Sequence, residues 1–308
     1  MFKYTMKPIQ ILLNTVEKIE GAYAPATIRA YKANFERFIF FCEEIDECAL
    51  PASSSLVAQY IKKLTFSNLK SSSIRIAVAA IATIHKLNQS PDPTQNPEVA
   101  LELKRMYRSL GRESNQAYGI NNNILEKLLN ANDKDLRGVR DKALLLVAYD
   151  SLCRRSELVS LMAEDLIIIN TQTESSCKLK LRKSKTDQDA KGRWLYLSKE
   201  TQKALNEWLE AAGIQSGKIF RGVKNQVGLS DGLNASQINR IFKKLAKKSK
   251  LDPSVIQQIS GHSMRVGAAQ DMLLAGASMP MIMNRGRWSK PDTVMRYVEY
   301  AGFNVNQD

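Results

Sequence analysis

Residues 260–266 read SGHSMRV, residues 286–288 read GRW, and residues 293–297 read TVMRY. His262 and Arg265 are three positions apart, so on a helix their side chains lie on one face and can approach the same ligand. Arginine offers a planar fork of donors that holds two phosphate oxygens, and histidine can move a proton near neutral pH. This part of the sequence therefore suits a phosphate ligand.

The spacing H-x-x-R is by itself a pattern that chance often supplies, but here it has specific surroundings. Residues 261–272 read GHSMRVGAAQDM, and Trp288 and Tyr297 follow at characteristic distances. Together they resemble the C-terminal motif of the tyrosine recombinase (phage integrase) family, in its Cre-like branch. The resemblance implies a mainly α protein with a small antiparallel β-sheet. An all-α N-terminal core-binding domain would precede an α+β catalytic domain.

The charge of the chain favours a polyanionic partner. Lys and Arg outnumber Asp and Glu by 45 to 31 in 308 residues, which gives a formal charge of +14 and a pI near 9.6. Either nucleic acid or an anionic membrane surface fits such an excess, and the charge does not choose between them. The family resemblance implies double-stranded DNA.

Other features of the sequence bound its location and chemistry. The N-terminus has no apolar signal core, and no run of about eighteen apolar residues occurs, so we expect a soluble, cytoplasmic protein. The family resemblance implies that it is encoded by a bacterium or a phage and associated with the nucleoid. The cysteines form no C-x-x-C pair, and the only histidines are His85 and His262. We therefore expect no metal site and no disulfide framework. The expected reduced thiols are Cys42, Cys48, Cys153 and Cys177.

The first 112 residues show helical spacing of apolar residues and no strand pattern. We predict helices at 11–19, 27–45, 56–64, 74–87 and 97–110, with N-caps among Ser53–Ser55 and Ser71–Ser73. This indicates a compact all-α domain over residues 1–112. Residues 111–119 lack periodicity and have glycine at both ends, which predicts a linker at 113–119, and residues 120–308 would form the catalytic domain.

Lysines and arginines line the predicted polar faces of the N-terminal helices. An ordinary solvated surface explains any single one of them. The resemblance implies that helices of this domain cross the DNA major groove. Lys70 and Arg75, at the start of the fourth helix, are then the first candidates for DNA contact.

The second half of the chain mixes helices and strands. A helical run begins near Asn121, and residues 139–149 contain the stretch 143–148, which is apolar almost all round, as expected of a buried helix. Residues 165–170, 178–182 and 193–197 have strand patterns and predict a small antiparallel sheet. Residues 201–212 and 236–250 are again helical.

Two further motifs gain a role only from the family resemblance. Residues 154–161, RRSELVSL, match the family's first arginine motif, with Arg154 as a phosphate-binding arginine and Glu157 as its supporting acid. Alone, this pair would be a surface i,i+3 ion pair worth a few tenths of a kcal/mol. A turn beginning K-S-K-T matches the hairpin of the family's catalytic lysine at Lys185, where an unrelated chain would simply have a solvated lysine.

The helix at 236–250 is strongly basic, and the corresponding helix of the family enters the major groove. Amide and guanidinium groups match the edges of adenine and guanine. The expected DNA contacts are Gln237, Asn239, Arg240, Lys243 and Lys244.

The resemblance implies transesterification at a DNA phosphodiester. Arg154 and Arg265 would hold the non-bridging oxygens, because charge builds on them during attack. The indole N–H of Trp288 would add a hydrogen bond, at a position where many members of the family have histidine.

Tyr297 would be the nucleophile, losing its proton to or through His262 and forming a 3′-phosphotyrosine. Lys185 would protonate the departing 5′ oxygen. Neither a cofactor nor a metal is required. We expect Tyr300 to be a packing aromatic, because the motif spacing matches Tyr297.

Three functions remain open from the residues. The first is a site-specific recombinase acting as a homo-oligomer, with a dimer on an inverted-repeat site and a tetramer joining two duplexes. The second is a monomeric DNA-relaxing enzyme of the type IB topoisomerase kind, and the third is a non-catalytic DNA-binding protein. The complete residue set speaks against the third, and the N-terminal helical domain with its linker favours the first.

Overall fold

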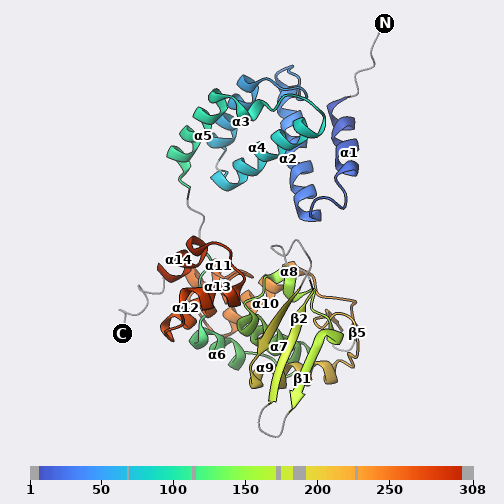
Figure 1. Cartoon of the computed structure of the whole chain (residues 1–308), viewed down its shortest axis with the longest axis vertical. Helices are drawn as coiled ribbons and strands as arrows, with labels where there is room; N and C mark the ends of the chain where they lie inside the picture. The colour runs from blue at the N-terminus through green and yellow to red at the C-terminus, as the bar shows by residue number, and fades with distance from the viewer. Residues whose placement is uncertain are drawn as a thin grey trace. The chain divides into compact units, whose positions relative to one another are not determined.

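The computed structural model describes residues 7–67, 69–112, 116–170, 175–182, 192–225 and 228–299. The chain divides into two compact units, Met1–Asn115 and Gln116–Asp308, each with its own hydrophobic core (Figure 1). The division falls within the segment 113–119 that the sequence predicts as a linker. Helices dominate both units, and the strands belong to the second.

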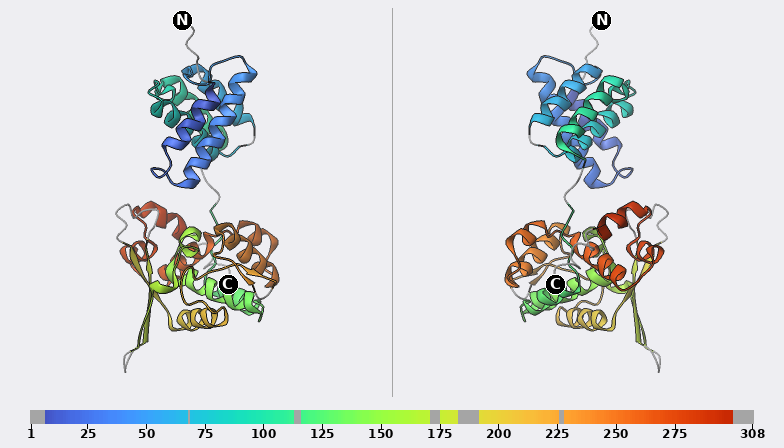
Figure 2. Two further views of the ribbon diagram at one scale, coloured as in Figure 1. Left: turned by 90° about the vertical axis from the view of Figure 1, so that its right-hand side faces the viewer. Right: turned by 90° about the vertical axis from the view of Figure 1, so that its left-hand side faces the viewer.

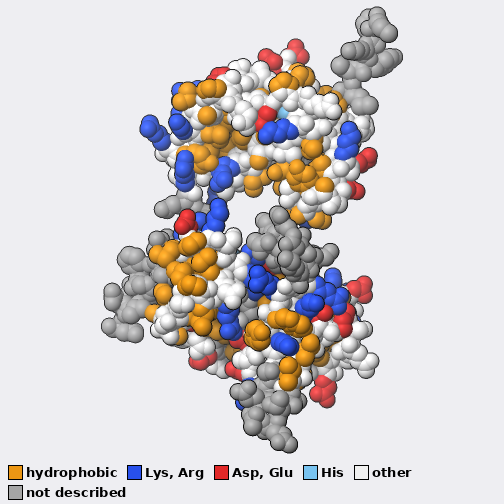
Figure 3. All heavy atoms as spheres, viewed as in Figure 1, with side chains coloured by type: hydrophobic (Ala, Val, Ile, Leu, Met, Phe, Trp, Pro, Cys, Tyr) orange, Lys and Arg blue, Asp and Glu red, His pale blue; other side chains and the backbone are white. Residues whose placement is uncertain are grey.

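The described N-terminal unit is a bundle of helices around Phe35, Phe38 and Ile81, all buried. Its helices are α1 (Pro8–Lys18), α2 (Pro25–Glu44), α3 (Ser54–Phe66), α4 (Ser71–Leu87), the 3₁₀ turn η1 (Pro93–Gln95) and α5 (Pro97–Leu110). His85 is a packing residue, since its Nδ1 lies 2.8 Å from the Ile81 carbonyl and its Nε2 accepts a 3.0 Å hydrogen bond from Ala52 N–H. Figure 3 shows Lys and Arg side chains gathered over α5.

Helix starts depend on capping, and here the predictions need two corrections. Ser53 caps α3 as expected, accepting from Leu56 N–H at 3.2 Å. The N-cap of α4 is Lys70, not one of Ser71–Ser73, and it makes no side-chain cap bond. Helix α2 begins at Pro25 rather than at Thr27, because proline is well suited to the first helical position.

The second unit contains the predicted antiparallel sheet, with strand order β1-β2-β3. The strands are β1 (Leu166–Asn170), β2 (Ser175–Leu181) and β3 (Arg193–Leu197), with Leu179 opposite both Leu166 and Leu195. Leu179 and Leu195 belong to the core with α7 (Leu136–Ser151) and α9 (Lys199–Ala211), which cover one face of the sheet (Figure 2). The other face exposes Ile167 and Tyr196. A further two-stranded ribbon, β4 (Val223–Lys224) and β5 (Gly228–Leu229), was not predicted.

Helix α7 is the centre of this unit, because residues 143–148 are all buried within it. It ends at Leu152, which adopts a left-handed conformation (φ 49°) and turns the chain into α8 (Arg155–Leu158). The remaining elements are α6 (Asn122–Asn130), η2 (Ala163–Asp165), α10 (Ala235–Lys248), α11 (Pro253–Gln258), α12 (Ser263–Leu274), α13 (Met279–Gly286) and α14 (Pro291–Glu299). None of the helices in the described ranges is both long and apolar enough to cross a membrane.

Candidate active site

Helices α12 and α14 bring His262 and Tyr297 together, and α10 supports the turn before His262. His262 is the N-cap of α12, and Tyr297 lies on α14. Although the two residues are 35 positions apart, His262 Nε2 and Tyr297 Oη are separated by 2.6 Å. The turn before His262 is held by α10, because Gly261 N–H donates to the Asn239 side-chain oxygen. A Cβ at Gly261 would lie 2.6 Å from that same oxygen, so this approach requires glycine.

Arg265 lies one helical turn beyond His262 and is completely buried. Its Nη2 donates to the Gly286 carbonyl at 2.9 Å, and its Nη1 donates to the Leu152 carbonyl. The carbonyls at helix C-termini are free of intrahelical partners and carry partial negative charge, so α7 and α13 provide natural acceptors for a guanidinium.

Trp288 connects Arg265 with Tyr297 through its ring. The Arg265 guanidinium lies 4.6 Å from the Trp288 ring centroid, and the Trp288 and Tyr297 rings are 5.6 Å apart. Gly286 allows this packing, because a Cβ there would lie 1.8 Å from a carbon of the indole. Gln270 on α12 adds a 3.0 Å hydrogen bond to the Tyr297 carbonyl and so fixes α14 beside α12.

The Arg154–Glu157 pair differs from an ordinary surface ion pair. Arg154 Nη1 donates to Glu157 Oε1 at 2.7 Å, and the backbone N–H of Arg154 donates to Oε2 at 2.9 Å. The Glu157 side chain is only 4% exposed, whereas that of Arg154 is 23% exposed. Glu157 therefore holds Arg154 from behind and leaves part of its guanidinium accessible.

Arg287 is a member of this cluster to which the sequence assigned no role. Its Nη2 donates to Glu157 Oε2 at 3.0 Å and to the Leu152 carbonyl at 3.1 Å. The segment GRW was visible in the sequence, but no local signal showed that the arginine between glycine and tryptophan turns toward Glu157. The site thus combines three guanidiniums with one carboxylate.

Burial and the arginines set the protonation of these groups. Burial, reinforced by Arg265 and Arg154, lowers the pKa of His262 to about 4, so its ring is neutral at pH 7. Burial raises the pKa of Tyr297, although the arginines oppose this, so the phenol keeps its proton in the free protein. Burial also opposes ionisation of Glu157, but Arg287 and Arg154 outweigh it and lower the pKa of the carboxyl. A neutral imidazole is therefore paired with a protonated phenol.

The proposed general acid, Lys185, lies outside the described residues, and so does Tyr300. The six other expected catalytic residues lie in one unit, and the contacts above connect them into a single cluster.

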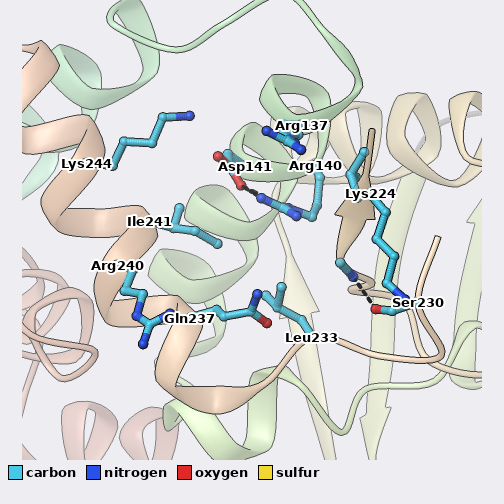
Figure 4. Close-up of a pocket in the computed structure, with 12 residues that line it drawn as sticks. Arg137, Arg140, Asp141, Lys224, Ser230, Leu233, Gln237, Arg240, Ile241 and Lys244 are labelled. Carbon is cyan, nitrogen blue, oxygen red and sulfur yellow. Dashed lines mark hydrogen bonds and ion pairs between the residues drawn. The ribbon is translucent and has the colours of Figure 1, made fainter. Parts of the chain in front are cut away.

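A basic cavity of about 550 Å³ lies beside α10. Figure 4 shows its cationic side chains, with Arg137 and Arg140 from α7, Lys224 from β4, and Arg240 and Lys244 from α10. Arg140 is paired with the buried Asp141 at 2.6 Å. The cavity therefore presents several cations around one internal ion pair, which suits a polyanion more than a small apolar ligand.

The expected DNA-contacting residues of α10 differ in how far their polar groups are already used. Gln237 Oε1 accepts from Asn234 N–H at 2.8 Å, and Asn239 holds Gly261. Lys243 donates to the Gln257 carbonyl at 3.1 Å, and Lys244 pairs with Asp133 at 3.2 Å.

Arg240 is exposed and makes no hydrogen bond or ion pair with another residue of the described ranges. In the N-terminal unit, Lys70 and Arg75 are both exposed at the start of α4.

Comparison with known proteins identifies the class to which this fold and site belong. Residues 120–302 match the Phage integrase family, and the chain belongs to this family of tyrosine recombinases, enzymes that cleave and rejoin DNA strands. An integrase/recombinase XerD homologue of Selenomonas ruminantium is 27% identical over 310 residues, covering 97% of this chain and 88% of that protein. The Cre recombinase of Escherichia phage P1 is 26% identical over 265 residues, covering 80% of this chain and 76% of that protein.

Solved structures show the same fold. The XerH site-specific recombinase bound to a palindromic difH substrate has a TM-score of 0.69 at 16% identity, covering 97% of this chain and 83% of that chain. The Tn1549 transposon integrase in complex with transposon right-end DNA has a TM-score of 0.63 at 13% identity, covering 98% and 100%. The family, the fold class and the kind of enzyme predicted from the sequence are confirmed.

Proposed function

We propose that this chain is a site-specific recombinase in which Tyr297 becomes covalently joined to the 3′ end of a cleaved DNA strand. The observation that carries the proposal is the 2.6 Å contact between Tyr297 Oη and a neutral His262 Nε2, directly beside the buried Arg265. A nucleophile, its base and a fixed guanidinium meet at one point, as the attack on a phosphodiester requires.

The charge of the cluster matches the charge that develops in the reaction. Arg154, Arg265 and Arg287 carry three positive charges, and Glu157 compensates one of them. A phosphodiester brings one negative charge, and attack by a phenolate builds a second one on the phosphorane. The two uncompensated positive charges therefore favour the transition state over the bound substrate.

Phosphate binding prepares the proton transfer from Tyr297 to His262. Burial depresses the pKa of His262 most, and Arg265 and Arg154 depress it further. A bound phosphate would neutralise these arginines in part, so the pKa of the imidazole would rise from its depressed value. His262 then accepts the Tyr297 proton while Oη forms its bond to phosphorus. The bond from phosphorus to the 5′ oxygen breaks, and that oxygen takes a proton from Lys185.

The phosphotyrosine preserves the energy of the broken phosphodiester. A 5′ hydroxyl from a second duplex can attack it, releasing Tyr297 and joining the two strands. We propose that this exchange takes place in a homotetramer on two duplexes, with a dimer on each inverted-repeat site. The solved lambda integrase dimer bound to a core site supports a dimer on one duplex.

DNA contact is proposed for both units. In the catalytic unit, the basic cavity beside α10 would receive backbone phosphates, and Arg240, which has no partner in the described protein, would reach a base edge. In the N-terminal unit, Lys70 and Arg75 would contact DNA from α4. The relatives named above are recombinases, which favours this function over a type IB topoisomerase.

The test is covalent capture on a suicide substrate. DNA selected by binding is nicked so that the cleaved end diffuses away, and the wild type should then form a complex that survives denaturant. Tyr297→Phe should bind the same DNA and form no such complex, while Tyr300→Phe should behave as the wild type. Trapping by Tyr297→Phe together with its loss in Tyr300→Phe would show that the nucleophile is misassigned.

A further inference from the structure

Arg287 occupies a backbone position that ordinarily favours glycine. It follows the last residue of α13 in a left-handed conformation, with φ 57° and ψ 46°. Its N–H donates to the Asn284 carbonyl at 3.2 Å, and Trp288 N–H donates to the Met283 carbonyl at 2.9 Å, which is the Schellman arrangement of a helix end. A residue with a Cβ is less favourable in this conformation than glycine. The side chain of Arg287 must therefore contribute something that glycine cannot.

The side chain has several acceptors and little solvent, because it is only 7% exposed. Nη1 donates to the Ser151 carbonyl at 3.0 Å, and Nη2 donates to the Leu152 carbonyl at 3.1 Å and to Glu157 Oε2 at 3.0 Å. Two of these acceptors also bind Arg154 or Arg265, the two clamp arginines that are expected to hold the phosphate. Glu157 also binds Arg154, and the Leu152 carbonyl also binds Arg265.

We propose that Arg287 is a positioning residue that couples the two clamp arginines, holding Arg154 through Glu157 and Arg265 through the Leu152 carbonyl. This inference rests on the proposed function, in which Arg154 and Arg265 hold the scissile phosphate. The role is indirect because Arg287 binds Glu157, the carboxylate that also holds Arg154, whereas Arg154 itself is 23% exposed and can meet a ligand.

An arginine is required here for its geometry as well as its charge. The planar fork places Nη1 and Nη2 on different acceptors at the same time, one from the end of α7 and one from α8. A lysine has one nitrogen on a flexible stem and cannot hold the Ser151 carbonyl and Glu157 in the same fixed relation. A methionine keeps much of the volume and removes every donor.

The experiment compares Arg287→Met, Arg287→Lys and Arg285→Met in the full-length protein on the suicide substrate. Arg285 is the matched control, because it is the same residue type on the same helix end, lines the same cavity of about 440 Å³, and does not contact Glu157. For each variant we would measure the dissociation constant for DNA, the single-turnover rate of covalent capture, and the midpoint of thermal unfolding.

Arg287→Met should slow capture on the order of tenfold to a hundredfold, less than loss of a direct donor to the phosphate. Arg287→Lys should fall between Arg287→Met and the wild type, and Arg285→Met should match the wild type. DNA affinity should change by less than about threefold in all of them, because the phosphate contacts themselves remain. Unchanged capture in Arg287→Lys would refute the need for the fork, whether or not Arg287→Met folds.

A double-mutant cycle separates positioning from general structural support. If Arg287 acts through Glu157, then Glu157→Gln with Arg287→Lys should lose much less than the product of the two single losses. Multiplied losses, or capture by Arg287→Met at the rate of Arg285→Met, would overturn the inference while leaving Tyr297 capture intact. Absence of capture in the wild type would instead refute the proposed function and the role of Arg287 together.

Discussion

Replacing Arg265 or Arg154 by methionine should separate two roles that both arginines are proposed to share. Arg265 is completely buried, and its removal leaves the Gly286 carbonyl without the donor that satisfies it. A buried unpaired carbonyl costs about 1–3 kcal/mol, whereas the Leu152 carbonyl keeps its hydrogen bond from Arg287. For a unit of this size, Arg265→Met should therefore lower the unfolding midpoint of the catalytic unit by roughly 2–12 °C.

Arg154→Met should leave that midpoint nearly unchanged. Its partner Glu157 keeps the hydrogen bonds from Arg287 and from the backbone N–H of residue 154, so no buried charge is left without a partner. Loss of either guanidinium should nonetheless reduce capture of DNA by about a hundredfold to a thousandfold, since each is an expected donor to the developing charge.

The assay combines thermal unfolding followed by circular dichroism with single-turnover capture and DNA affinity. The expected pattern is a capture defect in both variants and a stability defect in Arg265→Met alone, with affinity nearly unchanged. Equal destabilisation of the two variants would refute the assignment of Arg265 to the carbonyls at the helix ends. Parallel losses of affinity and capture would reduce both arginines to general phosphate contacts.

Three further predictions concern protons and salt. The folded pKa of His262, about 4, lies below its unfolded value of 6.5, so its stabilising contribution is full above pH 6.5 and is lost as the pH falls toward 4. By pH 5 the loss is about 2 kcal/mol, and His262→Gln should lack this part of the acid destabilisation; an identical pH dependence in the variant would contradict the shift. Lys185→Ala should cleave slowly and be rescued by a 5′-bridging phosphorothioate, whose sulfur leaves without a proton, and failure of rescue would remove the general-acid role. Finally, the logarithm of the DNA affinity should fall steeply with the logarithm of the salt concentration. Arg240→Gln should reduce that slope by about one if Arg240 contacts a phosphate, or relax the base preference if it contacts a base. Lys203→Gln on α9 is the charge-matched control, and an unchanged slope and base preference in Arg240→Gln would place Arg240 outside the interface.

Local signals account for much of the fold that the sequence predicted. Helix α5 spans Pro97–Leu110 as expected, because Asn96 caps it, Pro97 begins it and Gly111 follows it. The start of α4 was less readable, since three serines offered plausible caps and the chain used Lys70 instead. The ribbon β4–β5 has strands of two residues each, too short for any periodicity to appear.

The residues of the candidate site also differ in whether local sequence motifs or contacts with distant residues reveal their roles. The roles expected of Arg154, His262 and Tyr297 came from the resemblance of their motifs to those of the family. The role of Arg287 could not be found in this way, because it depends on a left-handed helix end and on Glu157, which is 130 positions away. The amides of Gln237 and Asn239 looked equally available in the sequence, whereas packing engages both of their oxygens within the protein.

The backbone carbonyls at the ends of α7 and α13 affect which amino-acid substitutions this enzyme can tolerate. Arg265 and Arg287 are anchored largely to the backbone oxygens of Ser151, Leu152 and Gly286, which exist whatever side chains occupy those positions. Substitutions along the outer faces of the two helices can therefore accumulate without moving the guanidiniums, provided that both helix ends keep their shape. An engineer who varies the exposed face of α10 to test its proposed DNA recognition should keep Asn239, because it fixes the turn that carries His262, and the buried residues Ile238 and Phe242.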